Sequence, residues 1–126
     1  MFKDFLPTYK RESGLFVIDL NDIPLPINFI VKEKSIVSIP PLEKGGNHMH
    51  PRIEVLVGLN EGLSFIWQDE KGNICEEAMK KKGKFRVFTV PSHLPHAVVN
   101  RSHTQTGILV EFADAKQTDV ELIQLI

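Results

Sequence analysis

Cysteine is almost absent from this sequence, with Cys75 the single one among 126 residues. One thiol cannot form an internal disulfide, so nothing indicates an oxidising compartment. Long apolar stretches are missing too, since the longest is about six residues and a membrane span needs roughly 18. The first residues, MFKDFLPTYKRESG, carry charges and a proline where a signal peptide would need an unbroken apolar core. We therefore expect a cytoplasmic protein without a membrane partner.

A basic excess is also missing. The chain has 15 Lys and Arg against 16 Asp and Glu, which gives a formal net charge of −1. Because phosphate contacts dominate affinity for nucleic acids, a nucleic-acid partner is not expected. The one basic cluster, in residues 80–86, surrounds Gly83 between two apolar runs and is typical of a solvated loop tip.

Short apolar runs are what the sequence contains in quantity. Apolar residues make up 42% and charged residues 25%, as in a single globular domain. The runs are rich in Val, Ile and Phe and end at Gly, Pro, Asn or Asp, without helical periodicity, which predicts an all-β sandwich or barrel. The predicted strands are 15–18, 29–31, 35–39, 53–57, 63–68, 74–79, 86–90, 97–100 and 107–112.

Three segments between or after these strands are also informative. Lys71-Gly72-Asn73 supplies residues that favour positive φ, which predicts a hairpin between the strands on either side. Residues 19–28 contain two prolines and are expected to form an irregular connection. In the tail, Thr118 and Glu121 have the spacing of a helix capping box, but residues 120–126 would also fit a strand. Both interpretations of the tail stay open.

The histidines are concentrated in one part of the chain. All five fall within residues 48–103, and four of them lie in two short segments. In an extended chain His48 and His50 point to the same side, and the parity of Glu54 also fits. The proline after His50 predicts a bend or bulge, with Glu54 at the start of the next strand. The second segment forms a turn with two prolines, after which His96 opens a strand.

These residue types have the chemistry of metal ligands. A lone histidine on a strand is usually a polar residue with a satisfied hydrogen bond, and an H-x-H pair is common by chance. The joint occurrence of the pair, a nearby carboxylate and a distant histidine favours a metal site. Three imidazoles and one carboxylate suit Fe, Mn, Ni, Cu, Co or Zn, with positions left for water or substrate. We therefore predict one divalent metal ion held by His48, His50, Glu54 and His96.

The first histidine segment resembles the first cupin motif, whose core is H-x-H, a short spacer, Glu and a later Gly. His48, His50 and Glu54 match its ligand positions, and Gly62 ends the run one position late. The resemblance therefore implies that these three residues are metal ligands. The fourth ligand comes from the second cupin motif.

The second segment resembles the second cupin motif, P-x-G-x-x-H-x-x-x-N, through Pro91, His96 and Asn100. His93 stands where that motif usually has Gly, so the turn has to form without a glycine there. His93 is a candidate for a catalytic acid–base group, although a turn histidine is more often simply exposed.

The resemblance implies a single-domain cupin β-barrel of the jelly-roll type. Residues 35–113 would form the barrel, residues 1–34 an N-terminal extension packing on it, and residues 114–126 a C-terminal tail. Small cupins are commonly dimers, so a homodimer is expected as well. Phe65, Trp67 and Phe88 are candidates for the cavity wall or the core, and Arg52 and Arg86 for an anion site or the solvent-exposed surface.

In function, the sequence resembles small cupins, some of which accompany surface-polysaccharide biosynthesis. This implies a metal-binding protein that acts on a small polar or carbohydrate-like molecule, with isomerase, epimerase or oxygenase chemistry if it is an enzyme. One alternative is a metal-free nucleotide-sugar ketoisomerase, whose motif resembles R-G-x-H-A-H followed by Gln. This chain lacks the arginine and keeps Glu54, and both differences favour a metal. The other alternative is a non-catalytic sensor or binding barrel.

Overall fold

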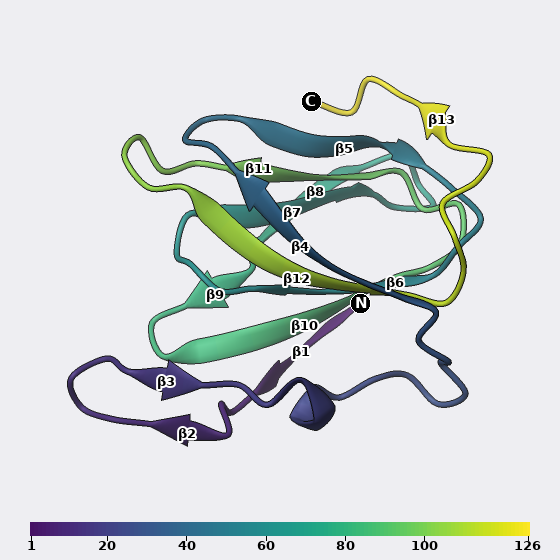
Figure 1. Ribbon diagram of the computed structural model, residues 1–126. Helices are drawn as coiled ribbons and strands as arrows, with labels where there is room; N and C mark the ends of the chain where they lie inside the picture. Colours follow the sequence, from purple (N-terminus) through teal and green to yellow (C-terminus); the bar gives the residue numbers. More distant parts are fainter.

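The computed structural model describes residues 1–126 and consists almost entirely of β-strands and their connections (Figure 1). Its one helical element is η1 (Leu20–Asp22), and no helix is long and apolar enough to cross a membrane. The prediction of an all-β chain is confirmed.

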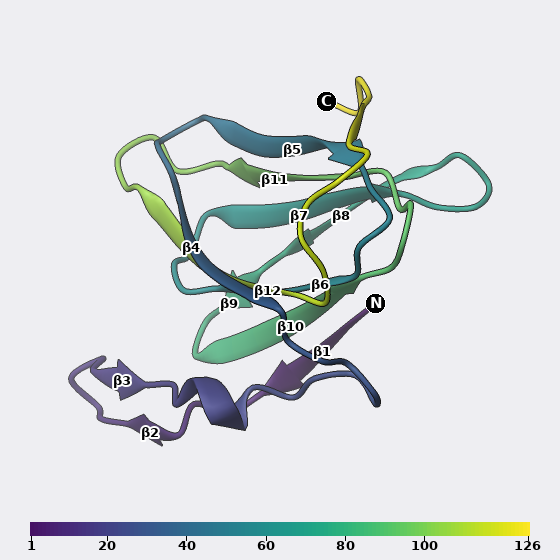
Figure 2. The same ribbon diagram turned by 45° about the vertical axis from the view of Figure 1, so that its right-hand side comes forward.

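Two antiparallel sheets face each other as in a jelly roll (Figures 1 and 2). The six-stranded sheet has the order β1-β10-β6-β12-β4, with β9 paired to β10. Its strands are β1 (Phe2–Phe5), β4 (Glu33–Ile39), β6 (Glu54–Gly58), β9 (Lys80–Lys81), β10 (Lys84–Val90) and β12 (Gly107–Ala113). The five-stranded sheet has the order β13-β5-β11-β7-β8. Its strands are β5 (Lys44–Met49), β7 (Leu63–Gln68), β8 (Ile74–Ala78), β11 (His96–Asn100) and β13 (Glu121–Leu122). A separate hairpin joins β2 (Tyr9–Lys10) and β3 (Phe16–Val17).

The space between the two sheets contains the main apolar core. Its fully buried aromatic rings belong to Phe65 of β7 and Phe88 of β10, whose centroids lie 5.0 Å apart. Trp67 packs against the same cluster and stacks on Phe65. Because side chains alternate along a strand, these residues share the inward face of their strands. Of the two predicted places for Phe65, Trp67 and Phe88, the cavity wall and the core, the structure therefore shows the core.

A second core covers the outer face of the six-stranded sheet. Residues of the N-terminal segment pack there, among them Ile23, Phe29 and Val31, against Val55 and Val57 of β6. β6 is thus buried on both faces, which explains why its sequence is a continuous apolar run instead of an alternating one. The N-terminal segment before β4 supplies this cover and also the edge strand β1.

The structure corrects one predicted strand and decides between the two interpretations of the tail. No strand forms at residues 29–31, where the apolar side chains pack on the outer core from a loop. The tail forms the short strand β13 and no helix, because its backbone bonds to β5: Ile123 donates to the carbonyl of Asn47 at 3.0 Å. The strand interpretation of the tail is the one that the structure supports.

A bulge interrupts the pairing of β5 with β11. His48 lies opposite His96, but Gly46 lies opposite Ala97, so Asn47 is the extra residue. Gly46 has φ of 83°, a conformation that residues with a Cβ rarely adopt. A Cβ at this position would lie 3.1 Å from Cα of Ala97. Glycine is therefore required here both by the backbone angle and by the close approach of β11.

The change Gly46→Ala is expected to lower the free energy of unfolding by about 2 to 3 kcal/mol, since it adds backbone strain and a clash with β11. Gly14→Ala is the matched control: its φ of 99° brings similar strain, but nothing lies within 4 Å of the added Cβ. The control is expected to lose only about 1 kcal/mol. Urea unfolding measures both, and equal losses would show that the contact with β11 contributes nothing.

Candidate metal centre

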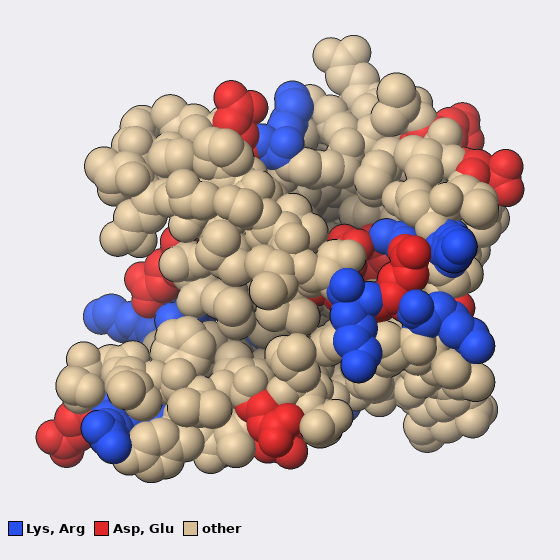
Figure 3. Space-filling model, viewed as in Figure 1, with Lys and Arg blue, Asp and Glu red and all other residues tan.

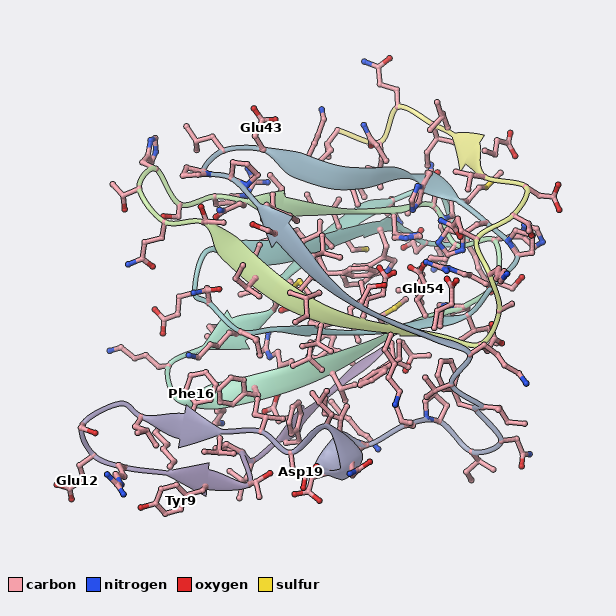
Figure 4. All side chains as sticks on the ribbon, in the orientation of Figure 1. Tyr9, Glu12, Phe16, Asp19, Glu43 and Glu54 are labelled. Atoms are coloured by element: carbon pink, nitrogen blue, oxygen red, sulfur yellow. The ribbon has the colours of Figure 1, made fainter.

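The predicted metal ligands come from three strands and one connection at the same end of the space between the sheets. His48 on β5 lies directly opposite His96 on β11, and side chains in such a pair project from the same face. His50 follows just after the end of β5, and Glu54 begins β6 after the break predicted from Pro51. Figure 4 shows Glu54 between the two sheets, far from the labelled residues of the N-terminal hairpin.

The four side chains converge. The ring centroids of His48, His50 and His96 form a nearly regular triangle with sides of 4.9 to 5.0 Å. One ring nitrogen of each histidine lies within 4.8 Å of the others. Oε1 of Glu54 lies 3.3 Å from Nε2 of His50 and 3.6 Å from Nε2 of His96. The structure thus brings together three imidazoles and one carboxylate that are up to 48 residues apart in sequence.

Backbone carbonyls orient two of the rings. Nδ1 of His50 lies 3.0 Å from the carbonyl oxygen of Arg52, and Nδ1 of His96 lies 2.8 Å from that of Leu94. A carbonyl only accepts, so each Nδ1 carries the proton and donates it. Nε2 of each ring is then free of its proton and faces the centre, the arrangement that metal-binding histidines use.

One buried atom has no partner within the protein. Nε2 of His50 makes no hydrogen bond, although the side chain is fully buried. Leaving such a group unsatisfied costs about 1–3 kcal/mol. Its nearest charged neighbour is the Glu54 carboxylate, which favours positive charge at this point. A proton or a metal ion at the centre would satisfy both groups.

Three carboxylates surround the guanidinium of Arg52 beside the site. Its Nε donates to Glu54 at 2.7 Å, one terminal nitrogen donates to Glu33 at 2.7 Å, and the other donates to Glu111 at 2.9 Å. The Arg52 side chain is only 8% exposed. Three carboxylates around one guanidinium leave an excess of two negative charges when the histidines are neutral. A divalent cation among the histidines would balance this excess, so the residues present fit a metal ion.

The electrostatics put two of the four residues, His48 and Glu54, in their metal-binding protonation states. Burial, and then the neighbouring His96 and His50, lower the pKa of His48 from 6.5 to about 4. Burial alone would raise the pKa of Glu54, but the nearby His50 and His96 rings and the guanidinium of Arg52 outweigh it and hold that pKa well below its usual range. Burial opposes the protonation of His50 too, but the Glu54 carboxylate outweighs it and raises the pKa of His50. At neutral pH, His48 is therefore neutral and Glu54 is ionised.

A cavity of about 240 Å³ adjoins the four side chains. His48, Glu54 and His96 form part of its wall, while His50 lies behind them. Its other lining residues are Val37, Ile39, Gly45, Gly46, Arg52, Leu56, Val98, Leu109, Glu111 and Gln117. Figure 3 shows a recess between the two sheets, with acidic and basic side chains gathered beside it.

The remaining motif residues lie outside this cavity. His93 has φ of 62°, so it makes the turn in the left-handed conformation that the usual glycine would adopt. Its side chain is exposed, and its backbone N–H donates to the carbonyl of His50 at 2.7 Å. An acid–base role for His93 stays a prediction. Asn100 is fully buried, and its amide donates to the carbonyls of Ile39 and Gln105, which makes it a structural residue of the motif.

The two arginines form ion pairs within the protein. Arg86 contacts Asp4 and Glu77, so carboxylates neutralise the charge of both guanidinium groups. Sequence reasoning missed Glu111 and Gln117 in the cavity wall. The signal that could have found Glu111 is its parity, since it shares the inward face of β12 with the core residue Leu109.

No protein-family model and no curated protein sequence matches this chain. Solved structures do resemble it, at low sequence identity. The capsular polysaccharide assembling protein CapF from Staphylococcus aureus superposes with a TM-score of 0.64 and 16% identity, over 98% of this chain and 30% of CapF. Oxalate oxidase in complex with glycolate gives a TM-score of 0.58 and 16% identity, over 71% of this chain and 45% of that enzyme.

The polyketide cyclase RemF from Streptomyces resistomycificus gives a TM-score of 0.55 and 16% identity, over 71% of this chain and 58% of RemF. All three proteins have the cupin fold. This chain is a cupin in fold. The prediction drawn from the two histidine motifs is thereby confirmed for the architecture. The cupin described here spans between about a third and three fifths of the length of these three chains.

In the metal-free protein, His48 is expected to titrate near pH 4, because burial and two neighbouring imidazoles disfavour its charged form. The unfolded chain takes up this proton near pH 6.5, so the His48 contribution to stability is present above 6.5 and is lost as the pH falls toward 4. His50 is expected to titrate above 6.5. Imidazole C–H resonances followed by NMR give both midpoints, and a His48 midpoint at 6.5 would contradict the described packing of the rings.

The change His93→Gly is expected to keep the metal-binding residues in place and to raise the free energy of unfolding by about 1 kcal/mol, because glycine adopts the left-handed conformation without strain. Chemical unfolding and metal content measure the two effects. A loss of turnover in this variant, with metal content unchanged, would instead support the predicted acid–base role of the His93 side chain.

Proposed function

We propose that this cupin binds one divalent transition-metal ion through His48, His50, Glu54 and His96. The observation that carries the proposal is the buried, unpartnered Nε2 of His50, which lies in a ring of three imidazoles and faces an ionised carboxylate. This donor set suits Fe, Mn, Ni, Cu, Co or Zn. When bound, the ion would supply Lewis-acid polarisation of a carbonyl or hydroxyl group, or activation of O₂.

The protein's own residues prepare the site for that role. The carbonyls of Arg52 and Leu94 hold two rings with Nε2 toward the centre. Arg52 occupies Oε2 of Glu54, which leaves Oε1 directed at His50 and His96. The site is thus preorganised, so that little side-chain movement is needed when a metal ion or a ligand binds.

The proposed ligand is a small polar or carbohydrate-like molecule, and the proposed chemistry is that of an isomerase, epimerase or oxygenase. The fold neighbours support this class: oxalate oxidase is a metal-dependent cupin, and CapF is a capsular polysaccharide assembling protein. A homodimer and a cytoplasmic location stay predictions from the family resemblance and the sequence.

Of the two alternative functions, only the metal-free enzyme has less support from the site. A metal-free ketoisomerase would be expected to carry Gln where this chain has the buried, ionised Glu54. A non-catalytic binding barrel would use the same ligand set and cavity, so only turnover separates it from an enzyme. Assays with sugars, keto acids and O₂ on the metal-loaded protein distinguish these two cases.

Elemental analysis of protein purified without added metal is expected to find about one transition-metal ion per chain. The changes His48→Ala and Glu54→Gln each remove a donor and are expected to lower metal affinity by at least roughly 100-fold. Added metal at 100 times its dissociation constant should stabilise the wild type against unfolding by about 2.7 kcal/mol, and both variants far less.

His103→Ala is the matched control for these variants, because His103 is an exposed histidine outside the cluster. It is expected to keep wild-type metal content and metal-dependent stability. The proposal is wrong if the wild type contains no transition metal and gains no stability from any of the candidate ions. It is also wrong if His103→Ala loses as much metal as His48→Ala.

A further inference from the structure

The cavity wall has two chemically different parts. One part is apolar and consists of Val37, Ile39, Leu56, Val98 and Leu109. The other carries His48, Glu54 and His96 together with Arg52, Glu111 and Gln117. A molecule that fills the cavity therefore needs a polar end beside the histidines and an apolar portion against residues such as Leu56 and Val98, which follow Glu54 and His96 along the same strands.

The cavity is also small. Its volume of about 240 Å³ holds about eight water molecules at roughly 30 Å³ each. Pockets for drug-sized ligands measure about 300–1,000 Å³. The cavity is open to solvent, so it encloses a ligand portion of about ten non-hydrogen atoms, and the rest of a larger molecule such as a nucleotide-linked sugar would lie outside it.

The charge of the wall restricts the ligand further. Arg52 is the one cationic side chain that lines the cavity, and carboxylates occupy its nitrogens on all sides. Glu111 takes the terminal nitrogen that Glu33 leaves free, at 2.9 Å, and its own side chain is only 20% exposed. An anionic ligand would find every guanidinium nitrogen already bonded to a carboxylate and would meet the negative charge of Glu111 in the wall.

We infer that Glu111 determines ligand specificity: by engaging Arg52 and adding negative charge to the wall, it restricts the cavity to small molecules that are neutral or carry a single negative charge and have an apolar portion. The inference rests on the proposed function, because an open coordination position on the bound metal ion is where an anionic end would bind. Dianions such as dicarboxylates and sugar phosphates are excluded. Glu111 acts on the ligand both through its own charge and through Arg52.

Three probes that share a six-carbon chain test this inference: 1-hexanol, hexanoate and adipate, which carry no, one and two negative charges. Their affinities are measured by isothermal titration calorimetry on protein as purified, with the metal content of each sample determined. Of hexanol and hexanoate, the probe that binds the wild type more tightly is expected to have at least 10-fold higher affinity than adipate. In Glu111→Gln, which removes the charge but keeps an acceptor for Arg52, adipate affinity should rise about 10-fold. In Glu111→Leu, which also frees the terminal nitrogen of Arg52, the affinity for adipate should rise further.

Glu76→Gln is the matched control, since Glu76 also pairs with an arginine, Arg101, but on the exposed surface away from the cavity. It is expected to leave all three affinities unchanged. The inference is overturned if adipate binds the wild type as tightly as hexanoate does, if no probe binds, or if both Glu111 variants keep the wild-type ratio. If the purified protein contains no metal, only the proposed function is wrong. The inference is still tested in that sample, because the negative charge of Glu111 and the engaged guanidinium of Arg52 predict that hexanol binds more tightly than adipate.

Discussion

The pairing of His48 with His96 across β5 and β11 is the constraint on which the site depends. Two residues directly opposite each other in antiparallel strands have Cβ atoms about 4.5–5.5 Å apart on one face of the sheet. The bulge at Asn47 sets this register, because without the extra residue His96 would lie opposite Asn47. A slip of one residue turns side chains to the other face of the sheet. The glycine at position 46, which permits the bulge, is therefore as important to the site as its ligands.

The second half of the site depends on Arg52. Its three carboxylate partners come from β4, β6 and β12, which are neighbours in the six-stranded sheet, so one guanidinium ties the connection after β5 to three strands. The same contacts fix Glu54 and the backbone carbonyl that orients His50. Because a buried charge is tolerated only with its partners in place, removing any one of these groups affects the others. Structural rigidity and the negative potential that favours a cation thus have a common origin.

The sequence was sufficient for the four candidate ligands, because strand parity and two short motifs encode them locally. It was not sufficient for β5, whose glycines and asparagine hide the β pattern, or for the tail, whose strand depends on bonds to Asn47. The roles of Glu111 and Arg52 depend on which strands are neighbours, and that is a property of the topology. An N-terminal extension that packs on the barrel was expected, but the residues that form the outer core could not be predicted, since the proline-containing segment shows no regular apolar period.

X-ray absorption spectroscopy at the edge of the metal that copurifies with the protein tests the central claim most directly. The account predicts a first shell of nitrogen and oxygen scatterers at about 2.0–2.2 Å, with the outer-shell scattering of three imidazole rings. That outer-shell signal should weaken by one ring in His48→Ala. A sample without a metal edge, or a first shell without imidazole scattering, would contradict the account.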